Sequence, residues 1–154
     1  MKEQYRKQII EMLTQAYWME LETVTNYIAN SVDLDGVRAE EIKKSLTADI
    51  TEELLHAQNM AKRVKEVGGR VPGSAGFRSM QKSLQPPMDS TDVETVIKGV
   101  IEAEDAAIDH YGKLIELAGE AHDYVTQDIC ITQLADEEGH RVMFAGFLKE
   151  YTKG

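Results

Sequence analysis

The sequence has one cysteine, three prolines and no long apolar run. Because Cys130 is alone, it excludes an internal disulfide and a cysteine-based zinc site, and it suits a reducing compartment. No secretory apolar segment stands at the start, and no run approaches membrane-spanning length. We therefore expect a cytoplasmic protein without a membrane partner. The scarcity of proline leaves long stretches free to form helices.

Positive charge is also scarce. The chain has 17 basic and 27 acidic residues, and its formal net charge is −10. This balance argues against duplex DNA as a general partner and suits a protein that handles cations. Its 154 residues are 42% hydrophobic and 29% charged, which is typical of a globular chain. We expect a single domain over residues 1–154.

Helical periodicity is present in four segments, each roughly 40–45 Å long at 1.5 Å per residue. The second predicted helix stops at Gly68–Gly69, a common helix-ending signal, and TDVE at 91–94 predicts a capping box at the start of the third. The predicted helices span residues 4–30, 37–67, 91–119 and 123–151.

The connections predict how these helices are arranged. Those at 31–36 and 119–122 are short, so each joins an antiparallel pair. The connection at 69–90 could extend about 70 Å, enough to run the length of a bundle. Helices two and three can therefore be parallel. We predict an all-α four-helix bundle of two antiparallel hairpins joined by a long crossover.

A Glu-x-x-His motif occurs once in each hairpin. Glu137 and His140 lie in DEEGH, and Glu53 and His56 lie in EELLH. A spacing of three places both side chains on one face of a helix. One such pair is weak evidence, because an exposed helix surface produces it by chance.

Two further acids stand on apolar helix faces. Glu20 shares its face with Leu13 and Val24, and Glu104 lies among Ile97, Ile101 and Ile108, whereas Glu22 and Glu102 lie on more polar faces. Both spacings, Glu20 to Glu53 and Glu104 to Glu137, are 33 residues. A tyrosine follows each first acid after seven residues, at Tyr27 and Tyr111. The pattern E-x6-Y…E-x-x-H therefore occurs twice, which is far more specific than either motif alone.

Charge indicates the chemistry of this pattern. Four carboxylates in one core would repel each other and be costly to bury unpaired. Two divalent cations would balance them, and two neutral imidazoles would complete the ligand set. Four oxygen donors and two nitrogen donors suit iron, with manganese also compatible, and the lack of thiolates disfavours structural zinc.

With these motifs the chain resembles the ferritin-like superfamily, in particular bacterioferritins and Dps-like mini-ferritins. The resemblance covers nearly the whole chain, and HDYVTQDICITQLADEEGH at 122–140 resembles the fourth helix of bacterioferritins. It implies two iron ions per subunit, with Glu53 and Glu137 bridging. Glu20 with His56 would complete one metal position, and Glu104 with His140 the other. Tyr27 would lie close to the diiron centre, and Asp136 would orient a histidine.

Three departures from those families refine the expectation. Leu54 stands where bacterioferritins carry a haem-ligating methionine, so no haem is expected. The fifth helix of larger ferritins is missing, which favours a homo-oligomeric shell of 12 subunits over one of 24 subunits or a dimer. Dps proteins form their site between subunits, whereas this chain carries a complete set. The apolar stripe Tyr17, Trp18, Met19 and Leu21 is interpreted as a subunit interface.

The resulting function is ferroxidase and iron storage or detoxification: Fe(II) would be oxidised by O2 or H2O2 at the intrasubunit site, a role in oxidative stress. One alternative is a rubrerythrin-like peroxidase without mineral storage. Such proteins commonly add a four-cysteine iron domain, which one cysteine cannot build. Another is a DNA-protecting Dps-type nucleoid protein, but the mildly basic ends, MKEQYRK and YTKG, argue against it.

Overall fold

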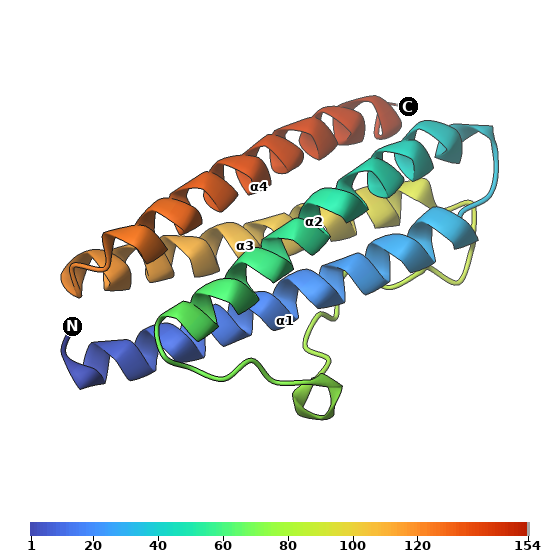
Figure 1. Cartoon of the computed structure of the whole chain (residues 1–154). Helices are drawn as coiled ribbons and strands as arrows, with labels where there is room; N and C mark the ends of the chain where they lie inside the picture. The colour runs from blue at the N-terminus through green and yellow to red at the C-terminus, as the bar shows by residue number, and fades with distance from the viewer. Residues whose placement is uncertain (154) are drawn as a thin grey trace.

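The computed structural model describes residues 1–153, and within them the chain folds into four long α-helices with no strand. The two short helices η1 and η2 are 3-10 turns. α1 packs along α2, α3 packs along α4, and α1 also contacts α3 (Figure 1). The predicted all-α bundle of two antiparallel hairpins is confirmed. The elements are α1 Glu3–Asp33, η1 Val37–Ala39, α2 Glu40–Glu66, η2 Ser74–Gly76, α3 Val93–Glu120 and α4 Tyr124–Tyr151.

The segment between α2 and α3, called the crossover below, returns along the bundle. In Figure 1 it leaves the end of α2 and reaches the opposite end before α3 begins, so α2 and α3 run in the same direction, as predicted. Glu22 anchors it: its carboxylate accepts hydrogen bonds from the backbone N–H groups of Met80 and Gln81 and from Ser79 Oγ, at 2.8–3.1 Å. Glu22 is therefore buried beneath the crossover although it lies on the more polar face of α1.

Leu84 fixes the far part of the crossover. Its side chain is buried in a core cluster although its backbone is left-handed, with φ of 64°. Asn30 Nδ2 donates to the Leu84 carbonyl at 2.7 Å. On α3, Gly99 faces this backbone, and a Cβ there would lie 2.8 Å from Leu84 N, closer than real Cβ atoms approach. The crossover can therefore lie this close to α3 because residue 99 has no side chain.

The starts of α2 and α3 differ from the prediction. Residues 37–39 form a 3-10 turn, and α2 begins at Glu40. The N-cap of α3 is Asp92, which accepts from the Thr95 N–H at 3.1 Å, so the predicted capping box of Thr91 and Glu94 is wrong. The Thr91 hydroxyl instead donates a hydrogen bond to the Asp89 carboxylate at 2.7 Å. An ionised carboxylate also accepts a hydrogen bond more strongly than a hydroxyl does.

The start of α4 repeats the arrangement of α3. Asp123 is the N-cap and accepts a hydrogen bond from the Thr126 N–H at 3.1 Å. It also accepts one from Arg63 Nη2 of α2 at 2.7 Å. This second contact ties the start of α4 to the end of α2, so the cap serves packing between helices as well as helix initiation.

Two apolar clusters fill the bundle, one toward each end. Fully burying one large aliphatic side chain contributes about 1.5–3 kcal/mol, so these clusters supply most of the packing energy. Cys130 is buried in the second cluster as a free thiol. The first contains Tyr27, Leu46, Ile97, Val100 and Phe144, and the second contains Ile9, Leu13, Met60, Tyr111 and Leu114.

The apolar stripe on α1 makes contacts within the chain, and its predicted role as a subunit interface stays a prediction. Trp18 packs edge-on against Phe77 of the crossover, with ring centroids 5.2 Å apart. Tyr17 Oη donates to the Pro72 carbonyl at 3.4 Å, and Met19 packs against the second cluster. The crossover thus uses this surface. None of the helices within residues 1–153 is both long and apolar enough to cross a membrane.

Candidate metal centre

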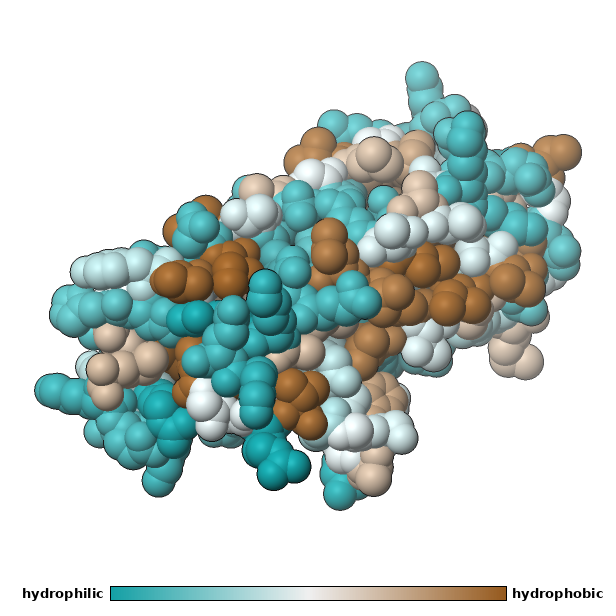
Figure 2. All heavy atoms as spheres, in the orientation of Figure 1, coloured by the Kyte–Doolittle hydropathy of each residue, from teal (hydrophilic) through white to brown (hydrophobic). Residues whose placement is uncertain are grey.

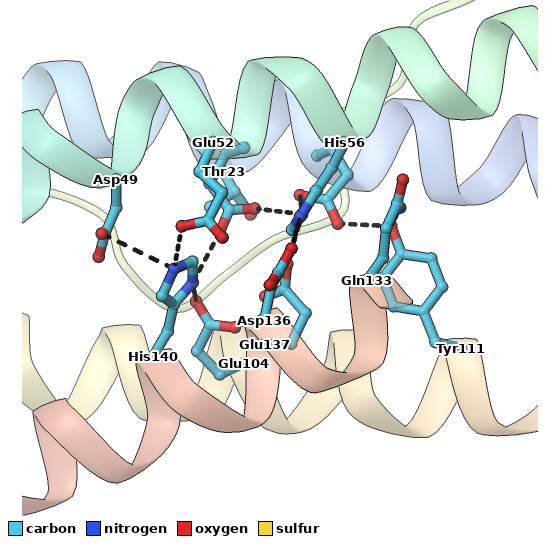
Figure 3. Close-up of polar contacts among 12 residues, drawn as sticks. Thr23, Asp49, Glu52, His56, Glu104, Tyr111, Gln133, Asp136, Glu137 and His140 are labelled. Carbon is cyan, nitrogen blue, oxygen red and sulfur yellow. Dashed lines mark hydrogen bonds and ion pairs between the residues drawn. The ribbon is translucent and has the colours of Figure 1, made fainter. Parts of the chain in front are cut away.

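The six residues proposed as metal ligands come together between the helices, and Figure 3 labels four of them, His56, Glu104, Glu137 and His140. Every helix contributes, and each of the six residues is at most 6% exposed. Helical spacing is the cause, since each Glu-x-x-His pair points two side chains inward from one turn. The contributions are Glu20 from α1, Glu53 and His56 from α2, Glu104 from α3, and Glu137 and His140 from α4.

The six residues form two overlapping groups. In each group one ligand atom per residue lies within 4.8 Å of the others. One group contains Glu20 and His56, the other contains Glu104 and His140, and both contain Glu53 and Glu137. Two adjacent positions that share two carboxylates are what a two-metal site with bridging acids requires.

The hydrogen bonding of the buried carboxylate and imidazole atoms indicates how well the centre fits metal ions. Buried polar atoms are nearly always hydrogen-bonded in folded proteins, and leaving one unpaired costs about 1–3 kcal/mol. Here one atom of each of five candidate ligands is buried without a hydrogen bond within the described chain. Four of these atoms lie against one another, because His56 Nδ1 is 2.8 Å from Glu137 Oε1 and His140 Nδ1 is 3.1 Å from Glu53 Oε1, so without metal only a proton on each imidazole pairs them. Hard carboxylate oxygens and imidazole nitrogens are donors that iron and manganese accept, so the residues fit a metal pair. The atoms are Glu53 Oε1, Glu104 Oε2, Glu137 Oε1, His56 Nδ1 and His140 Nδ1.

The carboxylates titrate abnormally because they are buried together. Burial, reinforced by the negative charge of Glu20, raises the pKa of Glu137 to about 12. Burial and the charge of Glu53 likewise raise the pKa of Glu20 well above its usual range. Burial also acts on Glu53, but hydrogen bonds from Glu20, His140 and His56 outweigh it and lower that pKa. Without metal, protons therefore take over part of the charge balance.

Both histidines are drawn toward their charged form. Burial opposes this, but contacts with Glu104 and Glu53 raise the pKa of His140 to about 12. The pKa of His56 is raised too, because its contacts with Glu137, Glu20 and Glu53 exceed the effect of burial. Since a ligating imidazole is neutral, metal binding must release these protons.

Two tyrosine hydroxyls form hydrogen bonds that join the hairpins. Tyr27 of α1 donates to Glu104 Oε1 of α3 at 2.8 Å, and Tyr111 of α3 donates to Glu20 Oε1 of α1 at 2.6 Å. Tyr27 thus lies beside the centre, as the resemblance implied, and Tyr111 occupies the matching place. Each hairpin holds an acid of the other.

The Nε2 atoms of the two histidines, which face away from the centre, also contact carboxylates of the opposite hairpin. His56 Nε2 lies 2.9 Å from Asp136 Oδ2, and His140 Nε2 lies 2.7 Å from Glu52 Oε2. Both Nδ1 atoms consequently face the centre, and both outer N–H groups have an acceptor. Asp136 was named from the sequence as a residue that orients a histidine, and it lies beside His56. Glu52 was not predicted, although it precedes Glu53 as Asp136 precedes Glu137.

Two more residues that were not predicted from the sequence lie beside the centre, Asp49 and Gln133. Each lies one helical turn before the shared glutamate of its helix. Asp49 Oδ1 is 3.7 Å from His140 Nε2, and burial raises the pKa of Asp49 to about 6. Gln133 Nε2 donates to Tyr111 Oη at 2.8 Å. The repeat therefore places an acid at one end of the centre and a neutral amide at the other.

The sequence is similar to that of known ferritins. Residues 10–153 match the ferritin family, described as a ferritin-like domain. A bacterioferritin from Desulfovibrio desulfuricans is 25% identical over 139 residues, which cover 90% of this chain and 73% of the relative. A bacterial ferritin from Neisseria meningitidis serogroup B is 31% identical over 96 residues. That match covers 62% of this chain and 56% of the relative.

Solved structures share the fold. A ferritin-like, diiron-carboxylate protein from Bacillus anthracis aligns with a TM-score of 0.84 at 22% identity, covering 96% of this chain and 99% of that one. The bacterioferritin of Desulfovibrio desulfuricans, solved with its diiron site in different catalytic states, aligns with a TM-score of 0.79 at 23% identity. It covers 95% of this chain and 81% of its own. The ferritin-like bundle predicted from the sequence is confirmed.

Proposed function

This chain belongs to the ferritin-like family, and on that premise we propose that it is a ferroxidase that stores or detoxifies iron. It binds two iron ions within one chain, oxidises Fe(II) with dioxygen or hydrogen peroxide, and passes Fe(III) to a mineral. The bacterioferritin relative supports iron as the metal, and the oxygen and nitrogen donors leave manganese as a competitor.

The two overlapping groups of buried carboxylates and imidazoles, which share Glu53 and Glu137, carry the proposal. Glu53 and Glu137 would be shared by the two ions, Glu20 and His56 would hold one of them, and Glu104 and His140 would hold the other. A pair of divalent ions supplies four positive charges to four carboxylates, which removes the cost of burying them unpaired.

Around the metals, the protein fixes ligands and excludes water. When bound, the iron supplies the electrons that the oxidant receives. Asp136 and Glu52 accept the outer N–H of His56 and His140 and hold each Nδ1 toward the metal. Tyr27 and Tyr111 hold Glu104 and Glu20 in place. The apolar clusters on either side limit solvent access to the centre.

Anaerobic Fe(II) titration followed by oxidant tests the proposal. Two ions bind per chain, and rapid oxidation follows when oxidant is added. Glu53→Ala abolishes that oxidation and keeps the helical fold, because it removes one bridging ligand. Glu102→Ala is the matched control, since Glu102 is an exposed acid on α3. Oxidation by Glu53→Ala at the wild-type rate contradicts the assignment.

Retained iron separates storage from the other functions. Many more ions held per chain than the two that bind first indicates storage. Two ions bound and none retained indicates a peroxidase of the rubrerythrin type. A DNA mobility shift at physiological salt tests a nucleoid role, and the net charge of −10 argues for no shift.

A further inference from the structure

A groove of about 360 Å³ between α2 and α4 is lined in part by His56 of the centre. Its inner wall includes His56, Gln133 and Asp136, and its outer part includes Asn59, Lys62 and Thr132. We propose that this groove is the oxidant side of the centre, that the oxidant is hydrogen peroxide, and that Gln133 Oε1 accepts its hydrogen bond. The inference rests on the proposed function, because iron at the centre is the electron source.

Gln133 is only 2% exposed, and its Oε1 is buried without a hydrogen-bond partner within the described chain. The direction of its amide is determined by its neighbours. The Tyr111 hydroxyl gives its single proton to Glu20, so it can only accept from Gln133, and Nε2 must face the tyrosine. The amide oxygen therefore faces away from Tyr111, as an acceptor still free for a ligand. Figure 3 shows the amide reaching from α4 toward α2 beside Tyr111.

The duplicated framework provides an internal comparison. The position matching Gln133 in the first hairpin is Asp49, near His140 at the other end of the centre. Asp49 and Glu52 make that end anionic and suited to a cation. At the other end Gln133 takes the place of that aspartate, while Asp136 and Glu52 lie beside His56. The two ends thus differ at this one position, which is an acid near His140 and a neutral hydrogen-bonding amide near His56.

Hydrogen-bond chemistry distinguishes the two oxidants. Hydrogen peroxide carries two O–H donors, whereas dioxygen has none, so an unpaired acceptor can stabilise only the peroxide. In the reaction the O–O bond breaks, and two Fe(II) each lose one electron. Both oxygens leave as water after taking up two protons: 2 Fe(II) + H2O2 + 2 H⁺ → 2 Fe(III) + 2 H2O.

The first test compares oxidants. The readout is the ratio of the second-order rate constants for Fe(II) oxidation by peroxide and by dioxygen, measured on the assembled protein. Gln133→Met, nearly equal in size, lowers this ratio about tenfold, the factor expected for one lost hydrogen bond. Thr132→Val, in the outer groove, is the control and leaves the ratio within twofold. A ratio unchanged in Gln133→Met overturns the inference.

The second test does not depend on turnover. Crystals of protein loaded with redox-inert Zn(II) are soaked in peroxide. A two-atom density about 2.8 Å from Gln133 Oε1 is expected in the wild type and absent in Gln133→Met. Water alone at this position, or peroxide bound beside Asp49 instead, overturns the inference. If the wild type binds Fe(II) but oxidises none, the proposed function fails, whereas the zinc crystals still decide whether peroxide binds at Gln133.

Discussion

Each tyrosine of the centre donates to a carboxylate that the opposite hairpin supplies. A donor removed from a buried carboxylate leaves an acceptor that no water reaches, and this costs about 1–3 kcal/mol. The same loss frees the carboxylate to rotate, so the metal position that uses it loosens. Tyr27 and Tyr111 therefore stabilise the fold and align ligands at once.

Tyr27→Phe tests this role. We expect the free energy of unfolding of the metal-free protein to fall by about 1–2 kcal/mol, because Glu104 loses its donor. Urea denaturation followed by circular dichroism measures the change. Tyr5→Phe is the control, since the Tyr5 hydroxyl makes no hydrogen bond within the described chain. Equal loss in both variants would mean that the hydroxyl of Tyr27 contributes nothing.

Some residues of the centre could be predicted from the sequence and others could not. Glu20 and Glu104 are visible because an acid on an otherwise apolar helix face is unusual. Glu52 and Asp49 stand on faces whose burial depends on how α2 packs against α4, which helical periodicity does not specify. Comparing the two hairpins would have identified Glu52 through Asp136, but not Gln133, because its counterpart is a different residue type.

At the scale of the elements, the position of the crossover depends on how closely its backbone approaches α3. Leu84 lies against α3 where Gly99 leaves space for its backbone. The sequence predicted that this segment runs the length of the bundle, since its length allowed it. Its path over Glu22 and Gly99 was not predictable, because a loop without periodicity does not reveal which helix face it covers.

Gly99→Ala should displace the crossover. We expect a loss of about 1–3 kcal/mol in the free energy of unfolding, because a methyl group would meet backbone atoms that cannot move independently. Thermal or urea unfolding measures it. Gly112→Ala in the same helix has open space at its Cβ and should gain about 0.5–1 kcal/mol from helix propensity. A stabilised Gly99→Ala would mean that the crossover does not rest on α3.

For the whole molecule, metal removal should make stability depend on pH. The pKa values of Glu137 and His140 are each raised to about 12, from 4.5 and 6.5 in the unfolded chain. Between about pH 7 and 9 the native state thus holds more protons than the unfolded state. The free energy of unfolding therefore falls as pH rises, by about 1.4 kcal/mol per pH unit for each extra proton. Glu53, whose pKa is lowered, is ionised in both states here and adds no slope.

Urea unfolding of chelator-treated protein at three pH values in this window measures the slope. Added Mn(II) should stabilise more strongly at the higher pH, since metal binding displaces the same protons. A slope of zero in the metal-free protein would show that the centre is already deprotonated and is not held together by protons.

We predict self-assembly from apolar surface that the fold leaves uncovered. Apolar side chains gather on the face that α1 and α2 form (Figure 2), and those of Ile28, Val32, Leu54 and Leu55 are exposed. Light scattering should give a shell, with 12 chains of 17.3 kDa favoured, about 208 kDa. Ile28→Glu combined with Leu54→Glu should break it, whereas Val142→Glu on α4 should not. A wild-type protein of one or two chains at micromolar concentration contradicts the shell.

The four helices contact one another unevenly. Within each hairpin the helices pack closely, but α2 and α4 approach each other at few positions. Near the centre, the groups that span this gap are Glu52, His56, Asp136 and His140, all tied to the metal positions. Metal ions held by these residues would therefore link the two hairpins at a place where few other contacts join α2 and α4. In amide hydrogen exchange, residues 49–60 and 130–141 should open faster in the metal-free protein, while the contact between α1 and α3 stays protected.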